Sequence, residues 1–196
     1  MDDVELARAL IYRLLGRALA EPADAGFLDR LARLDGGEGA VGAALRGVAE
    51  AARAATVEAA RAEYDVLFIG VARGELVPYA SFYLTGFLHE RPLARVRADM
   101  QALGLARVGG RLDPEDHVAT ECEVMATLIG RGDAAGQASF FERHLAPWAG
   151  RFFADLERAA SASLFRPVGT LGRLMMDLDR QGFALAAGAP MHKGAA

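Results

Sequence analysis

Apolar residues recur every three or four positions along the N-terminal quarter of the chain, which is the period of amphipathic α-helices. The first such segment begins at Asp2 or Asp3, whose side chains suit an N-terminal cap, and it stops at Glu21 and Pro22. A short helix then precedes the glycine-rich turn at residues 35–37, and an alanine-rich helix follows that turn. These three segments are predicted to be scaffold.

The middle of the chain combines two well-marked helices with a loop rich in turns and aromatic residues. Thr56 is predicted to cap a helix that ends at Gly70, and a second helix is predicted over residues 90–103. Between them, residues 71–77 lead into Pro78, which disfavours helix in the residue before it and is followed by several aromatic residues. We interpret this stretch as a candidate functional loop.

The C-terminal half is also predicted to be helical. Asp113 and Pro114 have the pattern of a helix start, with aspartate as the cap and proline at the first position. The acids that follow would face the positive end of the helix dipole. Pro147 either kinks a helix or opens a new one, and the final helix is predicted to end near Gly182.

The composition favours packed helices in one domain. Apolar residues make up 53% of the 196 residues and aromatic residues only 8%, a balance typical of helices rather than sheets. The chain is long enough for one sizeable core, and its glycine-rich linkers are too short to separate domains. We predict an all-α, single-domain helical bundle over residues 1–185, followed by a disordered tail over residues 186–196.

Charge and cysteine content restrict the partners and the compartment. The net charge is −4, so the long-range field does not favour a polyanion and nucleic acid is not an expected partner. Cys122 is the single cysteine, which excludes an internal disulfide and a multi-cysteine metal site within one chain. The acidic start and the lack of an apolar run of about 20 residues predict a cytoplasmic protein without stable membrane insertion.

Sequence motifs of common enzyme chemistries are absent. There is no G-x-S-x-G elbow and no phosphate-binding glycine loop, and the only lysine is Lys193 near the C-terminus. His117 and Glu121 are four residues apart and would share a helix face, as metal ligands can. We expect no catalytic residue, no metal and no cofactor. A small metal-dependent helical enzyme that uses His117 and Glu121 is kept as an alternative from another class.

Four short motifs follow one another in the chain and together suggest a family. They are Tyr64-x-x-Leu67-Phe68, Pro78-Tyr79-x-Ser81-x-Tyr83, the run from Asp113 to His117, and His144-Leu145-x-Pro147-Trp148. In this order and spacing they resemble the signature of the TorD/DmsD/NarJ family of molybdoenzyme maturation chaperones, also called redox enzyme maturation proteins. The resemblance extends over residues 1–180. Two positions depart from the pattern, because Asp113 replaces the usual glutamate and Tyr79 stands where several members have tryptophan.

The resemblance implies a helical chaperone of the TorD-like type and not an enzyme. Such a chaperone binds the twin-arginine signal peptide or N-terminal region of a client molybdopterin oxidoreductase, and it assists the client's folding, cofactor insertion and export. It is a monomer or a dimer formed by helix exchange. The positions that match the family's peptide-binding residues are Tyr64, Leu67, Phe68, Pro78, Tyr79, Ser81, Asp116 and His117.

The chemistry of a twin-arginine peptide leads to a similar site. The peptide joins a cationic stretch to an apolar one, so its receptor needs an apolar groove with an acidic rim. Leu67, Phe68, Pro78 and Tyr79 are expected to form the groove, and Asp113, Glu115 and Asp116 an exposed rim that binds guanidinium groups. His117 is expected to orient Asp116, to modulate affinity through its protonation, or to face solvent.

Two further alternatives remain open within this interpretation. The protein can be a nitrate reductase assembly factor that contacts the catalytic subunit more broadly, or an interaction protein that recognises no signal peptide. Some relatives bind guanine nucleotide, but no phosphate-cradling loop supports that property for this sequence.

Overall fold

The computed structural model describes residues 2–71, 73–106 and 113–188. Within these ranges the regular structure consists of ten α-helices and two π-helices, with no strand. In chain order they are α1 (Asp3–Ala20), α2 (Ala25–Ala32), α3 (Gly39–Ala54), α4 (Val57–Tyr64), η1 (Asp65–Ile69), α5 (Ala80–Thr85), α6 (Arg91–Ala102), α7 (Val118–Gly130), α8 (Ala134–Phe140), η2 (Phe141–Leu145), α9 (Ala149–Arg158) and α10 (Phe165–Gly188). The prediction of an all-α, single-domain fold is confirmed.

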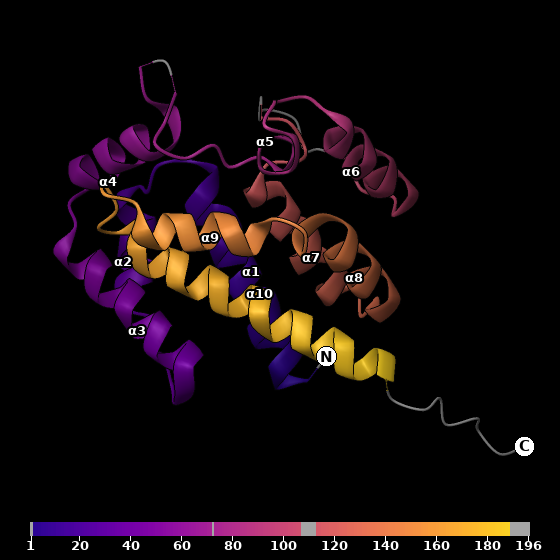
Figure 1. Cartoon of the computed structure of the whole chain (residues 1–196). Helices are drawn as coiled ribbons and strands as arrows, with labels where there is room; N and C mark the ends of the chain where they lie inside the picture. Colours follow the sequence, from indigo (N-terminus) through magenta and orange to yellow (C-terminus); the bar gives the residue numbers. More distant parts are fainter. Residues whose placement is uncertain (1, 72, 107–112, 189–196) are drawn as a thin grey trace, which may run out of the picture.

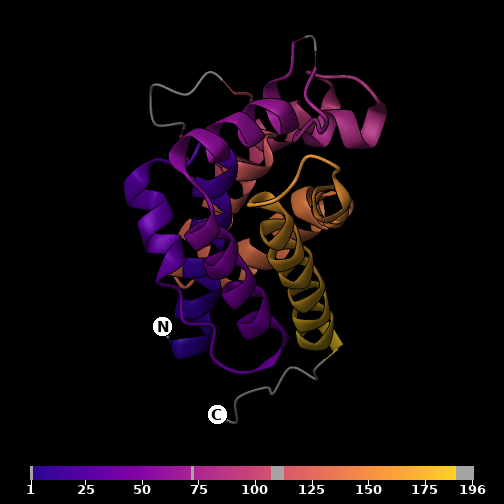
Figure 2. The ribbon, with the colours of Figure 1, turned by 90° about the vertical axis from the view of Figure 1, so that its left-hand side faces the viewer.

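The helices pack around one core. α1 lies along α7, and α9 lies along α10, whose other side contacts α3. α2 in turn packs on α3. Figures 1 and 2 place α5 at one end of the molecule, and the N-terminus of α1 and the C-terminal part of α10 toward the other. The first and the last helix therefore approach each other far from residues 73–83, which are called the aromatic loop below.

Small residues allow the two main helix pairs to approach closely. A Cβ atom added to Gly16 would lie 3.0 Å from Cγ of Glu123 on α7, and one added to Gly172 would lie 2.1 Å from the ring of Phe153 on α9. The spaces between the helices are filled by large side chains with almost no exposure, including Tyr12, Leu15, Met125, Leu128, Trp148 and Phe152. The amphipathic pattern of the sequence thus corresponds to one contiguous core.

Several predicted helix ends are confirmed by their capping contacts. Asp2 caps α1 by accepting the Glu5 amide at 2.8 Å, and Thr56 caps α4 by accepting the Ala59 amide at 3.2 Å. Gly70 ends η1 and has φ 62°, a left-handed value that glycine adopts without strain. These ends depend on local contacts, which explains why the sequence pattern locates them.

The predicted helix start at Asp113 is wrong, because α7 begins five residues later at Val118. The carbonyl of Pro114 accepts the His117 amide at 3.1 Å, which closes a turn in front of the helix. His117 is extended (φ −72°, ψ 136°) and acts as the N-cap of α7. The acidic run is therefore a turn that leads into α7, and its side chains are directed by contacts with other segments.

Two expectations for the C-terminal third are also settled. α10 continues to Gly188 instead of ending near Gly182, because its apolar side still packs at Phe183, whose ring lies 5.3 Å from that of Phe141. Pro147 lies between η2 and α9, so it precedes a new helix and does not kink one. The part of the predicted tail from residue 189 onward lies outside the described residues. Among the described helices, none is both long and apolar enough to cross a membrane.

Candidate functional site

A short antiparallel bridge joins the aromatic loop to the turn before α7. It pairs Tyr79 with His117, and it consists of the Ala80 amide donating to the Asp116 carbonyl and the Val118 amide donating to the Pro78 carbonyl, both at 2.9 Å. The rings of Tyr79 and His117 meet edge to face, with centroids 4.9 Å apart. Two stretches that are distant in the sequence are therefore adjacent in the fold.

The carboxylate of Asp116 holds the start of α5. Its Oδ2 atom accepts the backbone amide of Ser81 at 2.9 Å, although the two residues are 35 positions apart. The side chain is only 1% exposed, so the expectation of an exposed carboxylate at this position is wrong. Asp116 satisfies an unpaired amide at a helix N-terminus and fixes the direction in which the aromatic loop leaves the bridge.

His117 has a structural contact on each side. Nδ1 accepts the Ala119 amide at 3.1 Å, which caps α7, and the ring packs against Tyr79. Its exposure is 4%, so His117 does not face solvent. Because Nδ1 is an acceptor, a neutral His117 ring carries its proton on Nε2.

The side chain of Tyr79 connects the bridge to the surface. Its hydroxyl donates to Oδ1 of Asp113 at 2.7 Å, and the residue remains partly exposed. Burial, followed by this hydrogen bond, raises the pKa of Tyr79, so the hydroxyl stays protonated and keeps donating. Asp113 and Tyr79 therefore form a fixed polar edge beside an aromatic ring.

An apolar hollow of about 420 Å³ lies next to Tyr79. Three of the predicted site residues line it, namely Phe68, Pro78 and Tyr79. The remaining lining residues are Ile69, Arg73, Gly74, Leu76, Val77, Phe82, Gly86, Phe87 and Leu88. The single charged residue among them is an arginine, so the hollow itself does not have the expected acidic rim.

The other predicted site residues do not line the hollow. Leu67 has no exposed surface, and Tyr64 is buried with its hydroxyl donating to the Leu19 carbonyl at 3.3 Å. Ser81 is buried and its Oγ accepts the Glu90 amide at 3.3 Å. Glu115 is partly exposed and pairs with Arg97 at 2.6 Å.

Sequence reasoning missed the most exposed apolar residues of the hollow. Phe87 is 70% exposed, Ile69 is 59% exposed and Leu88 is 44% exposed. One signal was present in the sequence: Phe87 and Leu88 follow Gly86, so they continue no helical stripe. In the structure α5 ends at this glycine, whose φ is 83°. Large apolar side chains outside a helical period are candidates for a binding surface.

A second buried polar cluster lies behind the bridge. Glu121 on α7 is fully buried, and its Oε2 accepts the indole Nε1–H of Trp148 at 3.0 Å. Burial raises the pKa of Glu121 well above its usual range, and the indole hydrogen bond offsets only part of this effect. Cys122 beside it is also buried, and desolvation raises the pKa of its thiol. Among the described residues no three His, Cys, Asp or Glu side chains are grouped as metal ligands.

The fold and the hollow define an all-helical protein with an open apolar surface beside a bridged aromatic loop. Residues 35–154 match the family described as nitrate reductase delta subunit, which is more than half of the chain. This chain belongs to that family, and the resemblance to the TorD/DmsD/NarJ group is confirmed.

The relatives found among curated proteins have the name chaperone protein TorD. The chain is 26% identical over 133 residues to the TorD protein of Vibrio atlanticus, covering 61% of this chain and 62% of that protein. It is 31% identical over 70 residues to the TorD protein of Photobacterium profundum, covering 35% of this chain and 32% of that protein. The chain thus matches less than two thirds of the length of either relative.

A solved structure with a similar fold comes from Archaeoglobus fulgidus. It is a protein assigned to the redox enzyme maturation proteins, with a TM-score of 0.62 and 20% sequence identity. The similarity covers 87% of this chain and 93% of the other. At this identity the likeness concerns the helical fold.

Proposed function

We propose that this protein is a cytoplasmic maturation chaperone for a molybdenum-cofactor oxidoreductase. It binds the twin-arginine signal peptide or N-terminal region of this client and assists its folding, cofactor insertion and export. It acts by binding and performs no catalysis. Family membership and the TorD name of both relatives support the general role. The observation that carries the proposal is the bridge between Tyr79 and His117, which joins two family motifs at the edge of an apolar hollow.

The hollow suits the apolar part of such a peptide. Phe68, Tyr79 and Phe87 present aromatic surface in it, and Phe87 is more exposed than a soluble protein usually leaves a phenylalanine. Fully covering one such side chain contributes about 1.5–3 kcal/mol. A few apolar residues of a peptide therefore supply useful affinity without any enzyme-like chemistry.

The cationic part of the peptide has a separate contact in this proposal. Asp113 remains partly exposed next to the Tyr79 hydroxyl, and Glu115 remains partly exposed near it in sequence. A guanidinium group binds a carboxylate through two parallel hydrogen bonds. Asp113 is the carboxylate that we assign to the client arginines, since Glu115 already pairs with Arg97 and Asp116 is buried.

The remaining predicted site residues act indirectly. Asp116, Ser81 and His117 hold the loop in place through backbone contacts, and Tyr64 and Leu67 support Phe68 from the core. They are positioning residues in this proposal. Their substitution changes peptide affinity by moving Tyr79 or Phe68.

A second candidate function is favoured by one observation. The matching family is described as nitrate reductase delta subunit, which agrees with an assembly factor for the catalytic subunit of a nitrate reductase. Such a factor would contact its client over a broader surface than one hollow. The two candidates differ in whether an isolated signal peptide is sufficient for binding.

A peptide titration tests the proposal. Fluorescently labelled twin-arginine signal peptides from the molybdoenzymes of the same organism are titrated against wild type, Phe87→Ala and Asp113→Asn. Loss of the Phe87 ring is expected to weaken binding about tenfold, and loss of the Asp113 charge about threefold to tenfold. Leu10→Ala is the matched control, because Leu10 is an exposed apolar residue on α1, which contributes nothing to the hollow.

The peptides need controls as well. Replacing both arginines by glutamine should reduce the effect of Asp113→Asn but leave the effect of Phe87→Ala. Equal binding by all four proteins contradicts the proposed site. Binding of a whole catalytic subunit without binding of any signal peptide supports the assembly factor instead.

A further inference from the structure

A second and larger groove lies at the other end of the molecule from the aromatic loop. Its volume is about 960 Å³, more than twice that of the hollow beside Tyr79. The first turns of α1, one side of α8 and the C-terminal half of α10 line it, and Figures 1 and 2 show these parts away from α5. The groove shares no lining residue with the hollow.

The floor of this groove is apolar and partly open to solvent. Val4 is 68% exposed and Leu178 is 48% exposed, and both line the groove together with Met175 and Phe183. These residues come from α1 and α10, the first and the last helix, so they form a continuous surface only in the folded protein. A contiguous apolar surface of this kind indicates a docking site.

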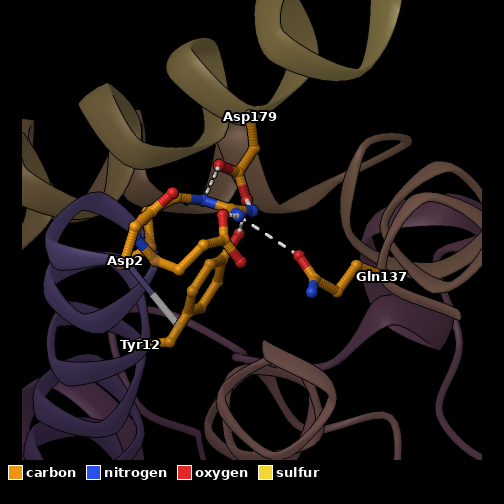
Figure 3. Close-up of polar contacts among 6 residues, drawn as sticks. Asp2, Tyr12, Gln137 and Asp179 are labelled. Atoms are coloured by element: carbon orange, nitrogen blue, oxygen red, sulfur yellow. Dashed lines mark hydrogen bonds and ion pairs between the residues drawn. The ribbon is translucent and has the colours of Figure 1, made fainter. Parts of the chain in front are cut away.

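A fixed polar network forms one wall of the groove. Arg8 donates to both carboxylate oxygens of Asp179 at 3.0 Å and to Gln137 Oε1 at 3.1 Å (Figure 3). The hydroxyl of Tyr12 donates to Asp179 Oδ2 at 2.7 Å, and Arg8 also pairs with Glu5. The guanidinium of Arg8 is thus already bound to carboxylates of the same chain.

The charge that remains around the groove is negative. Four carboxylates line it, from Asp3, Glu5, Glu142 and Asp179, against the one guanidinium of Arg8. Arg8 pairs with both Asp179 and Glu5 and offsets one of their two charges, whereas Asp3 and Glu142 make no ion pair or side-chain hydrogen bond with other described residues. The groove therefore combines an apolar floor with two available carboxylates at its edge.

We propose that this groove docks a cationic amphipathic helix of a partner protein. The apolar face of that helix covers Val4, Leu178 and Phe183, and its lysine or arginine residues pair with Asp3 and Glu142. An amphipathic helix places apolar side chains on one face and charges along its margins, which matches this surface. The inference goes beyond the proposed function, because the site is separate from the hollow and holds whether or not the hollow binds a signal peptide.

Electrostatics distinguish this occupant from a second copy of the chain. A symmetric dimer brings the same patch of both copies together, so Asp3 and Glu142 of one protomer would approach the same acids of the other. The chain as a whole also has a net charge of −4, so two copies repel each other at long range. Charge complementarity consequently favours a basic partner.

A designed peptide provides the test. The probe is a labelled amphipathic peptide of about 15 residues, the length at which an isolated helix becomes appreciable, with leucine on one face and lysine on the other. The fluorescence anisotropy of each labelled peptide is measured while the protein is added. Two further peptides serve as controls. One has the same composition with its leucines spread over all faces, and the other has glutamate in place of lysine. Only the amphipathic lysine peptide is expected to bind well, and added salt should weaken its binding.

Variants assign the binding to the groove. Leu178→Asp is expected to weaken binding about tenfold or more. Glu142→Gln should weaken it about threefold, and Glu142→Lys should weaken it further. Leu10→Ala is the control and should bind like wild type, because Leu10 is an exposed apolar residue on α1 that does not line the groove. Phe87→Ala reports any binding of the probe in the other hollow. Leu178 and Glu142 are exposed, and a circular dichroism spectrum equal to that of wild type confirms that each variant is folded.

Several results would overturn the proposal. They are equal binding of the lysine and glutamate peptides, unchanged binding by both groove variants, and loss of binding in Phe87→Ala alone. A concentration-dependent dimer that Leu178→Asp dissociates would identify a second copy as the occupant. Tighter peptide binding by Met191→Asp in the full chain would identify the protein's own C-terminal segment as the occupant.

Discussion

The indole Nε1–H of Trp148 on the turn before α9 donates to Oε2 of Glu121 on α7, at 3.0 Å and without exposure to solvent. The other oxygen, Oε1, has no hydrogen-bond partner among the described residues. A buried carboxylate with one hydrogen bond is costly when ionised. Burial and the nearby Asp116 raise the pKa of Glu121, which favours the neutral form of this side chain.

Glu121 is expected to make stability depend on pH. Because its folded-state pKa lies above the unfolded value, the folded protein binds the proton more tightly, and stability falls as pH rises from about 4.3 to the folded-state pKa. Glu121→Gln keeps an acceptor for Trp148 and removes the titration. Urea unfolding between about pH 5 and pH 8 should show a smaller fall for Glu121→Gln than for wild type. An unchanged fall would mean that Glu121 is ionised in the folded protein.

Asp116→Ala is expected to destabilise the protein by about 1–2 kcal/mol, because the Ser81 amide at the start of α5 loses its acceptor. Asp116→Asn keeps an acceptor oxygen and should cost less. The matched control is Asp177→Ala, since Asp177 is a partly exposed carboxylate paired with Arg180 and such surface pairs contribute about 0–1 kcal/mol. The stabilities of all three variants are compared by their denaturant midpoints. Equal losses of stability in Asp116→Ala and Asp177→Ala would contradict the capping role of Asp116.

Removal of one partner from the Arg8 network should have a large effect. Asp179→Ala leaves the guanidinium of Arg8 and the hydroxyl of Tyr12 without their main acceptor in a mostly buried position, so a loss of about 3–5 kcal/mol is expected. The double variant Arg8→Met with Asp179→Leu removes both charges and should be more stable than Asp179→Ala alone. The free energies of unfolding are measured by thermal or urea unfolding, and a double variant no more stable than Asp179→Ala would show that the two charges are not coupled.

Two glycines of α10 are expected to respond in opposite directions to the same substitution. In Gly172→Ala the new methyl group overlaps the Phe153 ring, so α9 and α10 must separate and the protein should lose about 1–3 kcal/mol. In Gly182→Ala the methyl group meets nothing within 4 Å, so the better helix propensity of alanine should stabilise the helix by about 0.5–1 kcal/mol. The melting temperatures of the two variants are compared directly. A higher melting temperature for both would contradict the close contact between Gly172 and Phe153.

Local signals in the sequence were sufficient for most of the scaffold. The caps at Asp2 and Thr56 and the glycine end at Gly70 involve residues a few positions apart, so their contacts can be inferred without knowing the fold. The spacing of apolar residues predicted which face of each helix is buried for a similar reason, since this spacing depends only on helix geometry. The family motifs can also be recognised in the sequence without knowledge of the fold.

The roles of the motif residues were decided by tertiary structure. Asp113 and Pro114 have the local pattern of a helix start, but Asp113 accepts the Tyr79 hydroxyl and Asp116 accepts the Ser81 amide, so the helix begins later. Contacts between residues more than 30 positions apart leave no periodic trace in a single sequence. For this reason the distinction between a buried positioning carboxylate and an exposed binding one was not readable from the chain.

The sequence by itself determined that the chain is helical, where most helices begin and end, and to which family it belongs, because these properties arise from neighbouring residues and from motifs in order. Only the folded chain decided which apolar residues stay exposed, as Phe87 and Leu178 do, and which acids are paired, as Asp179 is with Arg8. Exposure and pairing depend on which distant segments arrive at the same place, and that is settled by packing of the whole core.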